Sequence, residues 1–117
     1  MGHMNVRHYA GLFDDAGFQF LGYLAGPDVP AHLGWADVRS EVEYVHETAP
    51  GTLLTVTSSV TKVGRTSLTY RHEMTDSMTG AVHARALLVT VRFDLVERQA
   101  VPLEAGLRNR AEALLAE

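Results

Sequence analysis

The sequence lacks several features that would place it in a chemical or cellular class. Its 117 residues contain no cysteine, which excludes disulfides and thiolate catalysis and fits a cytoplasmic protein. No apolar run approaches the roughly 18 residues needed to cross a bilayer. The N-terminus also lacks a basic segment followed by an apolar block. We therefore expect no membrane partner and no secretory signal.

The charge pattern and the histidines exclude further classes. The net charge is −4 and the arginines are dispersed, so a basic footprint for nucleic acid is missing. Six histidines are present, but none forms an HExxH or another closely spaced ligand pair. We expect no nucleic-acid partner, no structural zinc site and no metal or redox cofactor. A metal site assembled in three dimensions stays open.

The N-terminal stretch predicts one amphipathic helix over about residues 6 to 25. Apolar residues recur there at three- and four-residue spacing, at Tyr9, Leu12, Phe13, Ala16, Phe20 and Leu24. Asn5 is a plausible N-cap, and Gly26 followed by Pro27 ends the run.

Three glycines lie inside this helix, at positions 11, 17 and 22. Each costs about 1 kcal/mol relative to alanine in an exposed helix interior. We interpret them as a sign that the helix packs closely against a sheet.

The rest of the chain reads as strands followed by a short helix. Residues 26–36 have a loop composition, with Trp35 packed over the end of the core or, alternatively, in a pocket wall. Alternating patterns predict strands over residues 38–44, 54–60, 68–75 and 81–95, joined by turns at 49–51, 63–67 and 76–80. In the first strand, the alternation places Val38, Ser40, Val42 and Tyr44 on one face. In the turn at 63–67, Gly64 is free to take a positive φ.

Two features of this second half define the architecture. Ala86 to Val91 is apolar on both faces except at Thr90. This pattern predicts a central strand that is covered on both sides. The helix would cover one side, and a second subunit could cover the other. A helix follows Pro102, with apolar residues at Leu103, Leu107, Ala111 and Leu114. The predicted class is α+β.

Four stretches together resemble the hotdog-fold acyl-CoA thioesterases of the 4-hydroxybenzoyl-CoA thioesterase type. They are GHMNVRHYAGLFDDA, VEYVHETAPGTLLTV, VTKVGRTSLTYRHEM and VRFDLVERQAVPLE. The resemblance implies one domain over residues 1–117, with an antiparallel sheet wrapped around one long central helix. It also implies a homodimer or dimer of dimers. Its active sites would lie between subunits, near the N-terminus of that helix, where amides around His3 to Val6 would polarise a thioester carbonyl.

The sequence departs from this family at one position. Members usually carry an acidic residue about three places before the glycine that matches Gly2, and a first strand ahead of it. Both would fall before Met1. A truncated or misassigned start, a cloning remnant at residues 1–4 and a natural variant are the possible explanations. The family-like tetrapeptide followed by Tyr9 argues against the remnant, and the other two stay open.

The candidate residues follow from this resemblance and from residue chemistry. Catalytic roles fall to His3, Asn5, Asp14 and Asp15, and substrate contacts to Tyr9, His72, Arg65 and Arg98. Simpler structural roles compete for several of them: a helix cap for Asn5, a core position for His72, and solvated turns for the two arginines. Adjacent carboxylates point about 100° apart on a helix, so Asp14 and Asp15 cannot face each other within one subunit.

The function expected from the resemblance is hydrolysis of an acyl-CoA or acyl-carrier thioester by water, with coenzyme A as part of the substrate and no other cofactor. The alternative is a non-catalytic module that binds acyl thioesters or small ligands and lacks the acidic residue.

Overall fold

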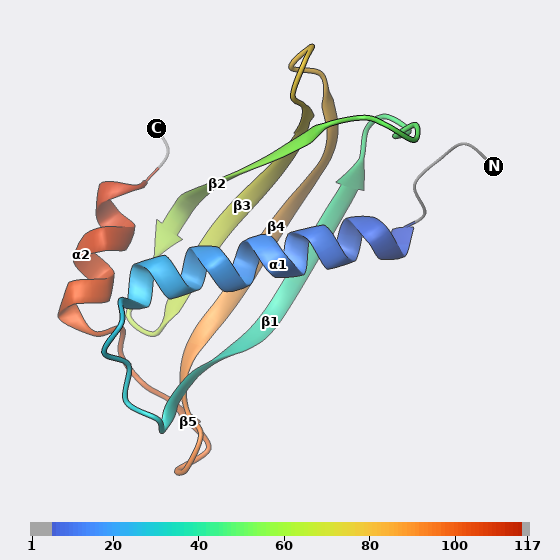
Figure 1. Ribbon diagram of the computed structural model, residues 1–117. Helices are drawn as coiled ribbons and strands as arrows, with labels where there is room; N and C mark the ends of the chain where they lie inside the picture. Colours follow the sequence, from blue (N-terminus) through green and yellow to red (C-terminus); the bar gives the residue numbers. More distant parts are fainter. Residues whose placement is uncertain (1–5, 116–117) are drawn as a thin grey trace.

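The computed structural model describes residues 6–115 (Figure 1). The elements in chain order are α1 (Val6–Ala25), β1 (Leu33–Tyr44), β2 (Leu54–Val63), β3 (Ser67–Asp76), β4 (Val82–Asp94), β5 (Gln99–Ala100) and α2 (Ala105–Ala113). The α+β class is confirmed, and so is a helix over the predicted residues 6–25. Neither described helix is both long and apolar enough to span a membrane.

All strand pairs are antiparallel, in the order β1-β4-β3-β2, and the short β5 pairs with β4. The strand that contains Ala86 to Val91 therefore lies in the centre, as its two-sided apolar run predicts. Helix α1 crosses one face of the sheet, and α2 lies at the end where α1 finishes (Figure 1). We refer to the face under α1 as the inner face.

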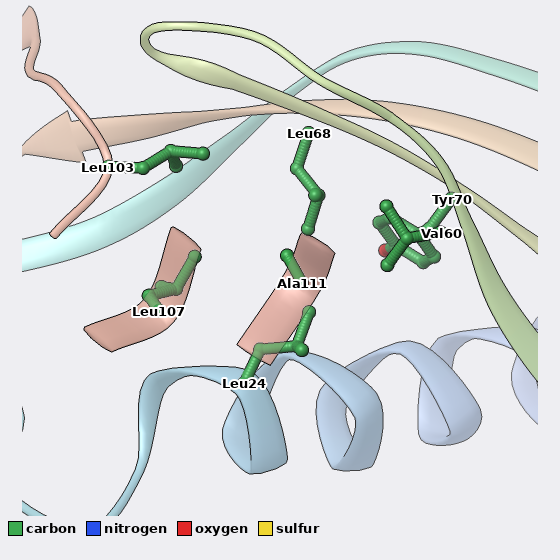
Figure 2. Close-up of a cluster of buried hydrophobic side chains, with 7 residues drawn as sticks. All are labelled: Leu24, Val60, Leu68, Tyr70, Leu103, Leu107 and Ala111. Carbon is green, nitrogen blue, oxygen red and sulfur yellow. The ribbon is translucent and has the colours of Figure 1, made fainter. Parts of the chain in front are cut away.

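Two clusters of buried side chains hold α1 on the inner face. The first joins the end of α1 to α2 and the sheet through Leu24, Val60, Leu68, Tyr70, Leu103, Leu107 and Ala111 (Figure 2). The second lies under the first half of α1 and consists of Tyr9, Phe13, Met74, Ala84 and Ala86. The helix therefore spans both parts of the core.

The end of α1 is closed by a glycine and an arginine. Gly26 adopts a φ of 80°, which is the left-handed C-cap predicted for it. Arg110 on α2 donates from Nε to the carbonyl oxygen of Leu24 at 2.7 Å, and from its terminal nitrogen to that of Ala25 at 3.2 Å. These bonds satisfy carbonyl groups that the helix itself leaves unpaired.

The close packing predicted from the helix glycines holds at one of the three. A Cβ at Gly17 would lie 3.2 Å from the Tyr70 hydroxyl, whereas one at Gly11 or Gly22 would meet no atom within 4 Å. Only Gly17 is required by the approach of α1 to the sheet.

The first strand begins earlier than predicted, and the predicted alternation of its side chains between the two faces is interrupted at one residue. It begins at Leu33 and includes Trp35, which the loop composition of residues 26–36 hid. The guanidinium of Arg92 lies 4.7 Å above the Trp35 ring and donates to the carbonyl of Gly34, so contacts with a distant strand hold this segment extended. A bulge between Asp37 and Arg39 leaves Val38 unpaired, which breaks the predicted alternation at that residue.

Smaller corrections concern the turns and the last helix. Gly64 does not take a positive φ; a Cβ there would instead lie 2.5 Å from the Ser67 hydroxyl. Helix α2 begins at Ala105 rather than directly after Pro102, with Glu104 at its N-cap position. The two-residue strand β5 was not predicted, because it is too short to show an alternating pattern.

The first core cluster predicts a large effect for one truncation. Leu24→Ala removes a side chain with no exposed surface that bridges α1, α2 and the sheet, so we expect a loss of about 3 kcal/mol in the free energy of unfolding. Urea denaturation followed by circular dichroism measures it. The matched control is Leu53→Ala, since Leu53 is 63% exposed. Equally small losses in the free energy of unfolding in both variants would contradict the role of the first core cluster in joining α1, α2 and the sheet.

Candidate functional site

The first turns of α1 are joined to the sheet by a buried chain of hydrogen bonds. The Tyr9 hydroxyl pairs with the Thr48 hydroxyl at 2.9 Å, and the latter with Nδ1 of His83 at 2.8 Å. Thr48 lies in the loop after β1 and His83 at the start of β4. Because all three side chains are buried, this network fixes the N-terminal end of α1 against the loop.

Two predicted catalytic residues, His3 and Asn5, lie outside the described residues, and with them the predicted N-cap. Tyr9 lies near the helix start, as expected, but it is buried and its hydroxyl is occupied by Thr48. A substrate contact of Tyr9 stays a prediction. Sequence patterns did not reveal Thr48 or His83, because each lies more than 30 positions from its partner along the chain.

A cavity of about 390 Å³ lies along the flank of α1, between the helix and the inner face of β1 and β4. The residues that line it are mostly apolar. Four of them have polar or charged side chains: Asp14, Asp37, Tyr70 and Arg92. Of the two adjacent carboxylates predicted as catalytic, only Asp14 lines this cavity. Small apolar cavities with a few polar groups are the usual form of ligand sites.

Tyr70 and His72 lie side by side under α1 at Gly17. Both extend from the inner face of β3, with ring centroids 5.2 Å apart. Burial, followed by the negative charges of Asp37 and Asp14, raises the pKa of Tyr70 to about 12. The phenol therefore stays protonated and can donate a hydrogen bond into the cavity.

His72 is a fully buried, neutral histidine. Its Nδ1 pairs with the Ser58 hydroxyl at 2.7 Å, and its ring stacks on Phe13 with centroids 5.8 Å apart. Burial lowers its pKa to about 4, and its Nε2 has no hydrogen-bond partner. The next residue, Glu73, instead pairs with Arg85 on β4. His72 does not line the cavity, so its role in substrate binding stays a prediction.

Arg92, which lines the cavity, is buried and forms an ion pair with the partly exposed Glu104 that sequence reasoning missed. Arg92 donates from Nε and from a terminal nitrogen to the two carboxylate oxygens of Glu104, both at 2.8 Å. Hydrogen bonding from Arg92 lowers the pKa of Glu104. An arginine within an apolar central strand is the sequence signal that could have revealed the pair. Since Arg92 also bonds Gly34, it anchors β1, β4 and α2 together.

The two arginines predicted as substrate contacts, Arg65 and Arg98, lie towards the C-terminal end of α1 and not near its start. Arg65 is in the turn between β2 and β3, where its carbonyl accepts a bond from Leu103 ahead of α2. Arg98 is exposed in the turn before β5, with a φ of 57° and its guanidinium over the Phe93 ring. A helix of this length extends about 30 Å, so within one subunit neither adjoins the helix start. Their role stays a prediction.

No group of three or more metal-ligating side chains occurs within residues 6–115.

The whole-chain resemblance is borne out by comparison with known families. Residues 1–111 match the family model of the thioesterase-like superfamily. The chain belongs to this superfamily. A search of curated protein sequences gives no significant match.

Several solved structures have the same fold as this chain. The PA5185 protein of Pseudomonas aeruginosa strain PAO1 superposes with a TM-score of 0.88 at 22% identity, over 99% of this chain and 82% of that one. A predicted thioesterase from Bacillus stearothermophilus gives 0.85 at 24%, over 99% and 86%. A thioesterase from Thermus thermophilus, complexed with coenzyme A and zinc, gives 0.79 at 26%, over 97% and 81%.

The neutral state of His72 predicts that acid destabilises the protein. An unfolded histidine titrates near pH 6.5, whereas His72 in the folded chain titrates near 4. The unfolded state takes up the proton first, so stability is complete above about pH 6.5 and falls by up to about 3 kcal/mol towards pH 4. Urea denaturation at a series of pH values measures the slope.

The variant His72→Phe should remove this histidine's share of the slope, while His8→Ala, at an exposed position of α1, should keep it. An unchanged slope in His72→Phe would show that His72 titrates normally.

Proposed function

We propose that this member of the thioesterase-like superfamily is an acyl-CoA thioesterase that releases a carboxylic acid and coenzyme A. The family match over residues 1–111, which includes the start of α1, carries the proposal. The cavity beside α1 supports it with a small apolar site of the kind an acyl group needs. The Thermus thermophilus relative, complexed with coenzyme A, favours this carrier over an acyl carrier protein.

The start of α1 supplies the electrostatic part of the reaction. Amides in the first turn of a helix have no partner within the helix, and the helix dipole adds positive potential there. Such donors can polarise a thioester carbonyl and stabilise the oxyanion formed when water attacks. The network of Tyr9, Thr48 and His83 holds this end of the helix in place. The thiolate of coenzyme A then leaves and takes up a proton.

Activation of water requires a base close to these amides. The first acidic residue in the sequence is Asp14, eight positions after the first residue of α1. It therefore lies about 12 Å along the axis from the start of the helix. An Asp or Glu ahead of Gly2, where the family carries one, would be better placed. No metal or redox cofactor takes part in the proposed reaction.

A non-catalytic acyl-thioester binding module is the second candidate. The absence of any Asp or Glu among residues 1–13 favours it. Such a module would keep the cavity and the fixed helix start but leave the thioester intact.

The functional unit that we propose is a homodimer or a dimer of dimers, with the sheet completed around α1 by the assembly. Residues Asp37–Tyr44 of β1 are exposed, and β1 is an edge strand of the sheet. We propose that the partner subunit covers four exposed apolar side chains of β1 and α1, which we call the apolar patch: Phe18, Val38, Val42 and Tyr44.

Oligomerisation is tested by sedimentation velocity at micromolar concentration. We expect a dimer or a tetramer, and Val42→Glu should shift the distribution towards monomer because it places a charge in the apolar patch. The control Leu53→Glu changes an exposed residue that lies in the loop before β2. A monomer at all concentrations would overturn the proposed assembly.

The hydrolytic proposal is tested by comparing the 117-residue chain with one extended by its native upstream residues. Losing a positioned general base typically costs about 10²–10⁴ in rate. We expect weak turnover of acyl-CoA by the 117-residue chain, and recovery in the extended chain through an Asp or Glu about three places before Gly2. Release of free thiol is the measurement.

Replacing that acidic residue by Asn or Gln in the extended chain should return the rate to the low value. Full activity of the 117-residue chain would instead move the base to His3, Asp14 or Asp15. An extended chain that binds coenzyme A thioesters without hydrolysing them would support the binding module.

A further inference from the structure

The cavity wall contains a hydroxyl group that its own chain leaves unpaired. Tyr70 is 2% exposed and lines the cavity, and its hydroxyl makes no hydrogen bond with another residue of the described range 6–115. This hydroxyl can therefore bond a polar atom that enters the cavity.

A buried polar atom without a partner lies close to this hydroxyl. Nε2 of His72 makes no hydrogen bond, and a Cβ at Gly17 would lie 3.6 Å from it and 3.2 Å from the Tyr70 hydroxyl. His72 does not line the cavity, so of these two polar groups only the Tyr70 hydroxyl can meet a ligand there.

The polar side chains that line the cavity indicate which kind of polar group a ligand would place there. Tyr70 stays protonated, so it donates, whereas the carboxylates of Asp37 and Asp14, which also line the cavity, accept. The Arg92 guanidinium bonds Glu104 and Gly34 and is already neutralised, so the wall offers no unpaired cation for a carboxylate. A hydroxyl group, which both accepts and donates, matches this set.

We propose that Tyr70 is a specificity-determining residue, whose hydroxyl donates to a hydroxyl substituent on the substrate's acyl chain while Asp37 accepts from that substituent. The inference rests on the proposed thioesterase function and names its substrate class: thioesters of hydroxylated fatty acids. The remainder of the chain would lie against the apolar walls that Phe13, Leu21 and Leu88 provide.

The test uses binding of free acids, so it does not depend on hydrolysis. Dodecanoate is compared with the hydroxydodecanoates that carry the hydroxyl at successive chain carbons. Isothermal calorimetry gives each dissociation constant. The fluorescence of Trp35, the sole tryptophan in the sequence and part of the cavity wall, reports whether the cavity is occupied.

We expect one or two of the hydroxy acids to bind about fivefold to tenfold more tightly than dodecanoate, the usual gain from one or two hydrogen bonds. Tyr70→Phe, which removes a single oxygen atom, should abolish this preference while leaving the affinity for dodecanoate unchanged or higher. Asp37→Asn should reduce the preference. The matched controls Tyr23→Phe and Asp28→Asn, at exposed residues outside the cavity wall, should keep it.

Three results would overturn the inference: no acid binds with a change in Trp35 fluorescence, no hydroxy acid binds better than dodecanoate, or the preference survives in Tyr70→Phe. The last result would show that Tyr70 faces only water. Failure of the thioesterase proposal is seen separately: a protein that selects hydroxy acids but does not hydrolyse their coenzyme A esters, even with its upstream residues, retains this site as a binding site.

Discussion

The close approach of α1 to the sheet at Gly17 is the contact on which the site depends. A Cβ at Gly17 would crowd the Tyr70 hydroxyl at 3.2 Å, whereas glycine leaves this hydroxyl and Nε2 of His72 room beside the helix. Burial raises the pKa of the Tyr70 phenol, with a further contribution from Asp37 and Asp14, and lowers the pKa of the His72 imidazole. The same stretch of α1 forms one wall of the cavity, so helix packing and ligand chemistry have a common origin.

The two ends of α1 are fixed by different interactions, and the difference has an electrostatic consequence. At the C-terminal end, the guanidinium of Arg110 bonds the carbonyls of Leu24 and Ala25, so a positive charge meets the negative end of the dipole. At the other end, the network of Tyr9, Thr48 and His83 contains no carboxylate. No acidic side chain of this network therefore neutralises the positive potential of the helix start.

Local patterns in the sequence predicted the elements well, because they arise within a few residues. The period of Tyr9, Phe13 and Leu24 defines α1, and the two-sided apolar run from Ala86 to Val91 identifies the central strand. The errors occurred where a distant contact decides the conformation. Residues 33–36 are extended because Trp35 and Gly34 meet Arg92, 58 positions from Gly34, which no local pattern reports.

The candidate site was less predictable than the fold for the same reason. Asp14 could be nominated from its position on a helix, but its neighbours Asp37 and Tyr70 come from β1 and β3, and only the sheet register brings them to one cavity. Thr48 and His83 likewise have no motif around them. Their importance depends on the hydroxyl of Tyr9, which the sequence suggested as a substrate contact and the structure assigns to Thr48.

In the proposed function, bond cleavage and substrate recognition would take place at different points along α1. Gly17 follows the first residue of α1 by eleven positions, which is about 16 Å along the axis. A polar group bound at Tyr70 is therefore too far from the first-turn amides to act on the carbonyl that they would polarise. A remote contact that is equally strong in the ground and transition states changes substrate binding but not the rate of the chemical step. If the proposed contacts are of this kind, variation at Tyr70 and Asp37 would alter substrate preference while the start of α1 keeps its geometry.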